Sequence, residues 1–243
     1  MSKKSIFVKI TFFFLIIFFS NNLFAKKAAI IIDFDTQETL FEVNADTLNF
    51  PASLTKMMTL YIVFDYLDRD KISWNTEMTV SKTAVSRTCS CLDIKAGDKI
   101  NVEDAVMALI IKSANNVATV ISEHISGSER NFAKLMTTYA HEIGMNKTTF
   151  KNASGLPNRA QMTTARDISM LSYKIIKRFP KKYKLFKTKK FTWKGKTYKT
   201  HNRLMQSYQG ADGIKTGYIR ASGFQLAFSA IRNDKRLIGV YFG

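Results

Sequence analysis

The distribution of apolar residues predicts strands at both ends of the chain and helices between them. Residues 28–34 and 39–43 are rich in apolar and β-branched residues and are joined by the polar turn 35–38, which indicates a β-hairpin. The last third contains a second small hairpin around Lys194-Gly195-Lys196. It is followed by three consecutive predicted strands, near 213–217, 224–230 and 237–242.

The middle of the chain follows the helical period. The first predicted helix opens near Pro51, ends at about Tyr66, and is apolar on nearly every face from Met57 to Phe64, a pattern typical of a helix enclosed by protein. A polar, irregular stretch follows it. Capping and stop signals then predict further helices at about 101–112, up to about 125, at 128–144 and at 165–179.

Strands at both ends with helices between them predict an α+β fold with one mainly antiparallel, five-stranded sheet. We expect the sheet to come from about 28–50 and 212–243, with a helical subdomain, about 51–180, inserted between them. Such an arrangement leaves a cleft between sheet and helices. The chain has no internal repeats and no Pro/Ser-rich linker, and residues 26–243 are treated as one domain.

The first 25 residues have the layout of a secretory signal. A basic end with three lysines precedes an apolar run over 10–19, which is too short to span a membrane comfortably, and the stretch finishes at Ala25. We expect export to the periplasm or cell envelope, with cleavage after Ala25. Because Leu23 is larger than the usual small residue, an uncleaved anchor is the alternative.

The chain is strongly basic. Its 243 residues are 46% hydrophobic and 23% charged, an ordinary globular composition, and carry a formal net charge of +18. Removal of the signal, with three lysines and no acid, leaves +15. For an exported protein this favours mild electrostatic contact with membrane headgroups or envelope polyanions. The basic cluster between Lys174 and Arg203 lacks a nucleic-acid fold signature, so we expect a solvated cationic face and no nucleic-acid partner.

Cysteines and histidines offer little chemistry on their own. Cys89 and Cys91 stand one residue apart, and an extended Cys-x-Cys spaces its side chains too widely for a disulfide, while two ligands are too few for structural zinc. Free thiols and a strained, redox-sensitive pair both remain open. The scattered His124, His141 and His201 are expected to serve packing or the surface, and we expect no metal and no cofactor.

The strongest candidate for chemistry is Ser53-x-x-Lys56 at the start of the first predicted helix. Residues three apart share one helix face, so the Lys56 amine is expected beside the Ser53 hydroxyl. A serine hydroxyl is a poor nucleophile until a base takes its proton, and a lysine can be that base when burial and nearby positive charge lower its pKa. The alternative is a helix cap with a solvated lysine.

Two further motifs follow in order along the chain. They are Ser113-x-Asn115, in a predicted turn between helices, and Lys215-Thr216-Gly217, on a predicted strand. Ser73-Trp74-Asn75 also fits the former, and Ser113 is preferred because it lies in the short turn. The order and placement of the three motifs resemble those of penicillin-binding proteins and serine β-lactamases, which implies a β-lactamase/transpeptidase-like fold. More narrowly, residues 28–243 resemble a low-molecular-mass D-alanyl-D-alanine carboxypeptidase, with further likeness at 111–116, 142–146, 152–157, 202–204 and 212–217.

This resemblance implies a serine-type carboxypeptidase that removes the terminal D-alanine from peptidoglycan stem peptides and binds β-lactam antibiotics. Ser53 would form the acyl-enzyme, Lys56 would accept its proton, and Ser113 with Lys215 would relay a proton to the leaving D-alanine. The two lysines are expected to lower each other's pKa. The substrate-binding groups that the resemblance implies are Asn115 for the amide, Lys215, Thr216 and Gly217 at the terminal carboxylate, and the backbone N–H groups of Ser53 and Tyr218 for the oxyanion.

Two departures from the family pattern matter. Tyr218 stands where family members commonly have His, which changes side-chain contacts but not the backbone donor. Many relatives continue into a covering helix, a β-rich second domain and an amphipathic anchor, whereas this reading frame stops at Gly243. We therefore expect one face of the sheet to lack a covering helix and to expose apolar side chains.

These departures keep alternatives open. Truncation would make the protein a non-catalytic or weakly active relic that still binds peptidoglycan or penicillin. A β-lactamase is a further alternative, although no carboxylate lies between Asn152 and Met162, where class A enzymes place their hydrolytic glutamate. A transpeptidase shares the acylation chemistry and differs in the acceptor, and the small size favours hydrolysis.

Overall fold

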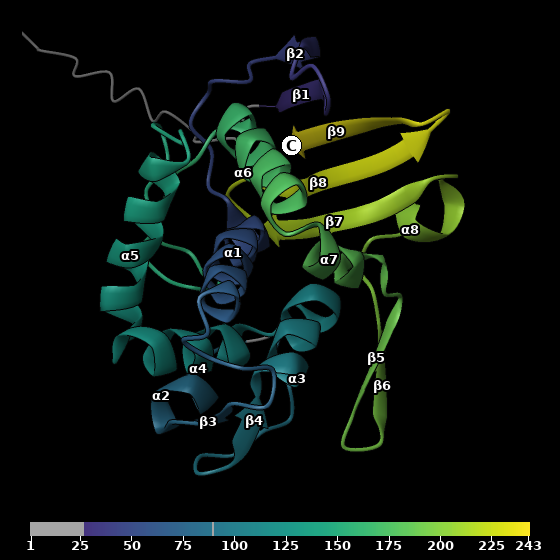
Figure 1. Ribbon diagram of the computed structural model, residues 1–243. Coiled ribbons are helices and arrows are strands. Elements are labelled where there is room, and N and C mark those ends of the chain that lie inside the picture. The colour runs from purple at the N-terminus through teal and green to yellow at the C-terminus, as the bar shows by residue number, and fades with distance from the viewer. Residues whose placement is uncertain (1–26, 89) are drawn as a thin grey trace, which may run out of the picture.

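The fold was obtained as a computed structural model that describes residues 27–88 and 90–243. The predicted signal, residues 1–25, and Cys89 lie outside the described residues. Within the described ranges, no helix combines the length and the apolar character needed to cross a membrane. A sheet packs against helices on one side, and most of the remaining helices gather at one end of it (Figure 1).

Five antiparallel strands from the two ends of the chain form one sheet, as predicted. Their order is β2-β1-β9-β8-β7, with β1 Ala28–Asp33, β2 Thr39–Val43, β7 Ala211–Ile219, β8 Gly223–Arg232 and β9 Lys235–Phe242. Ile30 pairs with Val240, so the first strand lies beside the last one, and Thr216 pairs with Leu226. Strand β7 is therefore an edge of the sheet, on the side where the helical part begins (Figure 1).

Helices fill the middle of the chain, and their starts follow the capping signals. Asn101, Ser128 and Thr164 each accept a hydrogen bond from the backbone N–H three residues further on. The helical elements are η1 Ala52–Leu54, α1 Thr55–Asp68, α2 Lys82–Val85, α3 Val102–Met107, the π-helical turn Ala108–Lys112, α4 Asn115–Ser126, α5 Glu129–Glu142, α6 Ala165–Arg178, α7 Pro180–Tyr183, η3 Lys184–Lys187 and α8 Leu204–Ser207.

Helix α1 is the centre of the molecule. It contacts α4, α5 and α6, and nearly all of its residues are buried, which confirms the prediction of a helix enclosed by protein. Tyr61 and Phe64 both pack edge-on against Phe179 at the end of α6. This packing fixes the axis of α1, and with it the turn that carries Ser53.

The sheet has one covered face and one uncovered face. Helix α6 contacts β1, β8 and β9 and lies across the sheet, although the sequence pattern placed it in the inserted helical subdomain (Figure 1). Ile238 and Val240 of β9 point to the helices and are buried, whereas Leu237 and Tyr241 point to the other face and are about 40% exposed. The expected exposure of apolar side chains is confirmed for the described residues.

Three local features differ from the sequence pattern. The polar stretch after α1 contains the short strands β3 Glu77–Thr79 and β4 Lys99–Asn101, which are too short for an alternating pattern to reveal. The predicted helix 101–112 changes from α to π geometry for its last turn. Asn115, expected in the connection, is already the first residue of α4. The small hairpin forms as predicted, from β5 Lys190–Trp193 and β6 Lys196–Lys199.

Candidate active site

A cleft of about 880 Å³ runs beside β7, between the sheet edge and the helical part of the chain. It brings together side chains from all three sequence motifs. Lys56 and Lys215 lie behind its surface, with 0% and 2% of their surface exposed. The predicted site residues that line the cleft are Ser53, Ser113, Asn115, Thr216, Gly217 and Tyr218. By contrast, Ser73 of the competing Ser-x-Asn triplet is exposed and contacts Thr76 in the loop after α1.

The Lys56 amine contacts the Ser53 hydroxyl, with Nζ 3.2 Å from Oγ. Nζ also donates to Asn115 Oδ1 at 2.7 Å and to the Ser154 carbonyl oxygen at 2.6 Å. Both of these partners can only accept hydrogen bonds, so together they take two N–H groups. A neutral amine then has its lone pair left for Ser53. The geometry suits a neutral Lys56 that accepts the proton of the Ser53 hydroxyl.

Burial lowers the pKa of both lysines. For Lys56 the pKa falls well below the ordinary lysine value because of desolvation and, second, because of the positive charge of Lys215, while Cys91 and Glu129 act in the opposite direction. Burial alone lowers the pKa of Lys215 to about 7. The expected repulsion between the two lysines thus contributes to the low pKa of Lys56, and desolvation is the largest cause for both lysines.

The second motif holds its serine in an unusual position. Ser113 follows the π-helical turn and has a left-handed backbone with φ of 60°. Its hydroxyl oxygen is buried and has no hydrogen-bond partner among the residues that the structure describes. An unsatisfied buried hydroxyl costs about 1–3 kcal/mol and calls for an explanation. Because Ser113 lines the cleft, a bound molecule could supply the missing partner.

Asn115 is held from both sides by protein groups. Its Oδ1 accepts from Lys56, and its Nδ2 donates to the Thr88 carbonyl oxygen at 2.8 Å. Its backbone N–H donates to the Ser90 carbonyl oxygen at 2.6 Å. The resemblance gave Asn115 only a contact with the substrate amide, whereas the structure adds a contact with Lys56. The second hydrogen of Nδ2 stays available for a ligand.

A glycine lets β7 approach the Ser53 turn closely. A Cβ added to Gly217 would lie 2.9 Å from Gln225 Oε1 and 3.2 Å from the Ser53 backbone nitrogen. Gln225 in turn donates from Nε2 to the Phe50 carbonyl oxygen at 2.6 Å, which ties β8 to the segment leading into η1. Any larger residue at position 217 would push the strand and the turn apart.

Sequence reasoning missed several groups of the site. Ser154 acts through its backbone carbonyl, and a carbonyl leaves no trace in a side-chain pattern; the nearest signal was the loop 152–157. His201, expected to serve packing or the surface, lines the cleft, and burial lowers its pKa, with Lys215 as the second cause.

Cys91 donates from Sγ to the Arg87 carbonyl oxygen at 3.2 Å. The described ranges hold no cluster of three His, Cys, Asp or Glu residues that could bind a metal.

The architecture is that of penicillin-binding proteins. D-alanyl-D-alanine carboxypeptidase DacD from Francisella tularensis superposes with a TM-score of 0.85 at 29% identity and covers 100% of this chain and 69% of that one. Penicillin-binding protein D2 from Listeria monocytogenes, in its ampicillin-bound form, superposes with a TM-score of 0.76 at 30% identity and covers 88% of both chains.

Sequence comparison defines the family more narrowly. Residues 19–243 match the D-alanyl-D-alanine carboxypeptidase family, and the chain belongs to it. D-alanyl-D-alanine carboxypeptidase DacC from Escherichia coli is 37% identical over 224 residues, or 89% of this chain and 56% of the relative. The Bacillus subtilis carboxypeptidase DacF is 33% identical over 225 residues, or 89% of this chain and 57% of the relative. The chain thus spans little more than half the length of these relatives.

Proposed function

We propose that the protein is a serine-type D-Ala-D-Ala carboxypeptidase that removes the terminal D-alanine from peptidoglycan stem peptides and also binds β-lactam antibiotics at the same serine. The observation that carries this proposal is the contact of 3.2 Å between Lys56 Nζ and Ser53 Oγ at the wall of a cleft. Asn115 Oδ1 and the Ser154 carbonyl oxygen take the two hydrogens of the neutral amine, so its lone pair can face Ser53. The names of the relatives support the same activity.

The proposed reaction begins with acylation of Ser53. Its Oγ attacks the carbonyl carbon between the two D-alanines while its proton passes to neutral Lys56. The oxyanion accepts hydrogen bonds from the backbone N–H groups of Ser53 and Tyr218. The close approach of β7 to the Ser53 turn at Gly217 supports the placement of these two donors beside each other. The C–N bond then breaks, and Ser113 with Lys215 passes a proton to the leaving amine. Water hydrolyses the resulting ester and releases the shortened peptide.

The substrate would bind along the edge of the sheet. Strand β7 has no strand partner on its outer side among the described residues, so an extended peptide can pair with its backbone there. Lys215 and Thr216 would bind the terminal carboxylate. A protonated Lys215 gains a counter-ion in this way, since its Nζ otherwise donates only to the Thr216 carbonyl oxygen, at 3.0 Å, within the described residues. Asn115 would hold the substrate amide with its second Nδ2 hydrogen.

The place of action is part of the proposal. A secretory signal over residues 1–25 would deliver the protein to the periplasm or cell envelope, where its substrate is found. A net charge of +15 after removal of that segment supports electrostatic contact with membrane headgroups or envelope polyanions. Such contact would weaken as salt is added.

Covalent labelling by a fluorescent penicillin tests the assignment of the nucleophile. The full chain should be labelled, Ser53→Ala should abolish labelling, and Lys56→Ala should reduce it nearly as strongly. Ser73→Ala is the control, because this exposed serine belongs to the competing Ser-x-Asn triplet and should leave labelling unchanged. Labelling of Ser53→Ala at the level of the unmodified chain would remove the assignment.

The product identifies the reaction. Incubation with a stem pentapeptide, followed by mass spectrometry, should show loss of one alanine. A protein that is labelled by penicillin but leaves the peptide intact would be the non-catalytic relic. Rapid release of hydrolysed penicillin would instead indicate a β-lactamase, which the absence of a carboxylate between Asn152 and Met162 argues against.

A further inference from the structure

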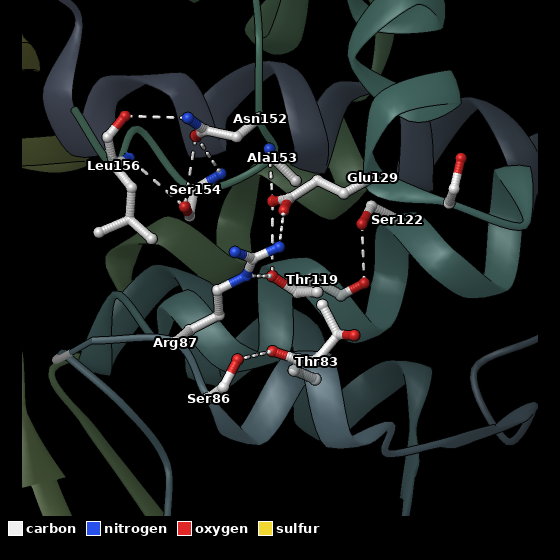
Figure 2. Close-up of polar contacts among 12 residues, drawn as sticks. Thr83, Ser86, Arg87, Thr119, Ser122, Glu129, Asn152, Ala153, Ser154 and Leu156 are labelled. Atoms are coloured by element: carbon white, nitrogen blue, oxygen red, sulfur yellow. Dashed lines mark hydrogen bonds and ion pairs between the residues drawn. The ribbon is translucent and has the colours of Figure 1, made fainter. Parts of the chain in front are cut away.

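The carboxylate of Glu129 joins three segments of the chain behind the active site. Glu129 is the first residue of α5, and only 12% of its side chain is exposed. Its Oε1 accepts the backbone N–H of Ala153 at 3.0 Å and the Thr119 hydroxyl at 3.4 Å, and its Oε2 forms an ion pair with Arg87 (Figure 2). Arg87 Nε also donates to Thr119 Oγ1, at 3.1 Å, which closes the network.

One branch of this network leads directly to Lys56. Ala153, whose N–H binds Glu129, precedes Ser154, whose carbonyl oxygen accepts from Lys56 Nζ at 2.6 Å. The Ala153 carbonyl oxygen also accepts from Thr59 Oγ1 at 2.7 Å, on the next turn of α1 after Lys56. Moving the Ala153 N–H away from Glu129 would therefore move the acceptor of the Lys56 amine.

The second branch leads to Lys56 through Asn115. Arg87 is followed by Thr88, whose carbonyl oxygen accepts from Asn115 Nδ2, and Ser90 further on accepts from the Asn115 backbone. Asn115 Oδ1 is the other acceptor of Lys56 Nζ, at 2.7 Å. Both groups that orient the lysine are thus attached to one partly buried ion pair.

A simpler role for Glu129 does not account for this geometry. An acidic residue in the first turn of a helix favours the helix dipole from a solvent-exposed position, and Ser128 already caps α5. The side chain of Glu129 instead turns inward, where an ion pair is expensive to desolvate and gains its energy only when its geometry and hydrogen bonds are good.

We propose that Glu129, paired with Arg87, is a positioning residue that holds the two acceptors of Lys56 so that the amine faces Ser53, an inference that rests on the function proposed above. Without the carboxylate, Ala153 and Arg87 no longer share the hydrogen-bond acceptor that links the Ser154 carbonyl to the Thr88 carbonyl. The amine then has no fixed direction. Acylation should slow more than penicillin binding weakens, because Asn115 and Gly155 line one wall of the cleft while Thr216 and Gly217 on β7 line the other.

Glu129 also acts on Lys56 through its charge. The charged or titratable groups coupled to Lys56 are Lys215 on β7, His201 before α8, Cys91, and Glu129 on α5. Lys215 lowers the pKa of Lys56, Cys91 and Glu129 raise it, and Lys56 itself lowers the pKa of His201. Neutralising Glu129 should therefore lower the pKa of Lys56. If neutral Lys56 is the base, the acid limb of the acylation rate moves to lower pH.

The test compares Glu129→Gln with Glu142→Gln, an exposed residue at the other end of the same helix. Stopped-flow labelling with a fluorescent penicillin separates binding from acylation over a range of pH. We expect Glu129→Gln to lower the acylation rate constant about tenfold or more, to raise the penicillin dissociation constant by a smaller factor, and to move the acid limb to lower pH. Glu142→Gln should match the unmodified chain. A Glu129→Gln variant with unchanged rate and acid limb would overturn the proposal.

Two further measurements keep the test decisive. If circular dichroism shows that Glu129→Gln does not fold, Arg87→Lys replaces it. This variant keeps the positive charge but loses the contact between Arg87 Nε and Thr119, so we expect acylation to be three- to fivefold slower. An unchanged acylation rate would overturn the proposal. NMR titration of lysines labelled with carbon-13 at Cε, with Lys56 assigned by Lys56→Ala, needs no activity. It should show a lower Lys56 pKa in Glu129→Gln, and an unchanged pKa counts against the proposal. Failure of the unmodified chain to react with penicillin would refute the proposed function instead, and the titration would still decide the role of Glu129.

Discussion

Gly155 lies so close to Ala52 that a Cβ on the glycine would sit 1.7 Å from the Ala52 carbonyl oxygen. Ala52 precedes the proposed nucleophile Ser53, and Gly155 follows Ser154, whose carbonyl oxygen accepts a hydrogen bond from Lys56. The turn that carries the hydroxyl and the loop that orients the amine are thus in direct backbone contact. Their relative position is fixed without any side chain between them.

Gly155→Ala should therefore separate Ser53 from Lys56. The new methyl group cannot coexist with the Ala52 carbonyl, so the loop must move, and a backbone φ of +88° adds strain of about 1–3 kcal/mol. We expect acylation by penicillin to fall about a hundredfold, because a displacement of about 1 Å can have that effect. Gly144→Ala is the control: φ is +94° there, but nothing lies within 4 Å of the added Cβ. Equal acylation rates for the two variants would show that contact with Ala52 is unimportant.

Ser113→Ala should lower activity without lowering stability. The hydroxyl is buried and unpaired among the described residues, so its removal leaves no partner unsatisfied. We expect a melting temperature equal to or slightly above that of the unmodified chain. Release of D-alanine from a pentapeptide should fall by about 10²–10⁴-fold, the range for loss of a proton-transfer group. A clear drop in melting temperature, with activity retained, would assign Ser113 a structural role instead.

The comparison of Ser113 with Gly155 shows which parts of the site could be predicted from the sequence. Ser113 was found because its triplet with Asn115 lies in a predicted turn between helices and follows the motif order of the resembled family. The pair Ser53 and Lys56 was found because positions i and i+3 meet on any helix. Gly155 had no assigned role, since close backbone contact depends on how two distant segments pack. The same holds for the Ser154 carbonyl and for the contact between Glu129 and Ala153.

The fold was more accessible than the network around the lysine. The alternating apolar residues Phe224, Leu226 and Phe228 share one face of β8, so the strand could be predicted from its period, although the face that is buried is the opposite one, with Gln225 and Ala227. Helix α6 was predicted as an element, but its position on the sheet is a tertiary property that periodicity does not contain. The pKa of Lys215 likewise depends on burial by residues far away in sequence, which a pattern of residue types does not contain.

Lys215 should give the reaction a basic limb near neutral pH. Burial lowers its pKa to about 7, so the ammonium that would bind a substrate carboxylate is present below this pH and lost as the pH rises through it. Since kcat/KM reports the free enzyme, we expect kcat/KM for a pentapeptide to decline above about pH 7. In Lys215→Arg the guanidinium stays charged, so this limb should disappear whatever activity is left. A basic limb that persists in Lys215→Arg must come from another group.

The buried carboxylate of Asp65 should dominate the stability of the helical core. Its exposure is 0%, and it accepts from Tyr139 Oη at 2.6 Å and Arg69 Nε at 3.1 Å, besides an ion pair with Arg178. These bonds connect α1, which carries Lys56, with α5 and α6.

Asp65→Ala removes the carboxylate that accepts from the Tyr139 hydroxyl and pairs with Arg178, whose guanidinium keeps the Tyr61 hydroxyl as an acceptor. Because the Arg178 side chain is 40% exposed, water replaces part of the lost pair, and we expect a cost of about 1–3 kcal/mol, which for a domain of this size lowers the melting temperature by roughly 5 °C. Glu77→Ala is the control, because the Lys99–Glu77 pair is about 60% exposed on both sides and should contribute less than about 1 kcal/mol. Thermal unfolding followed by circular dichroism compares the two variants. Equal melting temperatures would mean that water replaces the lost carboxylate, and that the contacts of Tyr61 and Phe64 with Phe179 hold α1 in place without help from the ion pair.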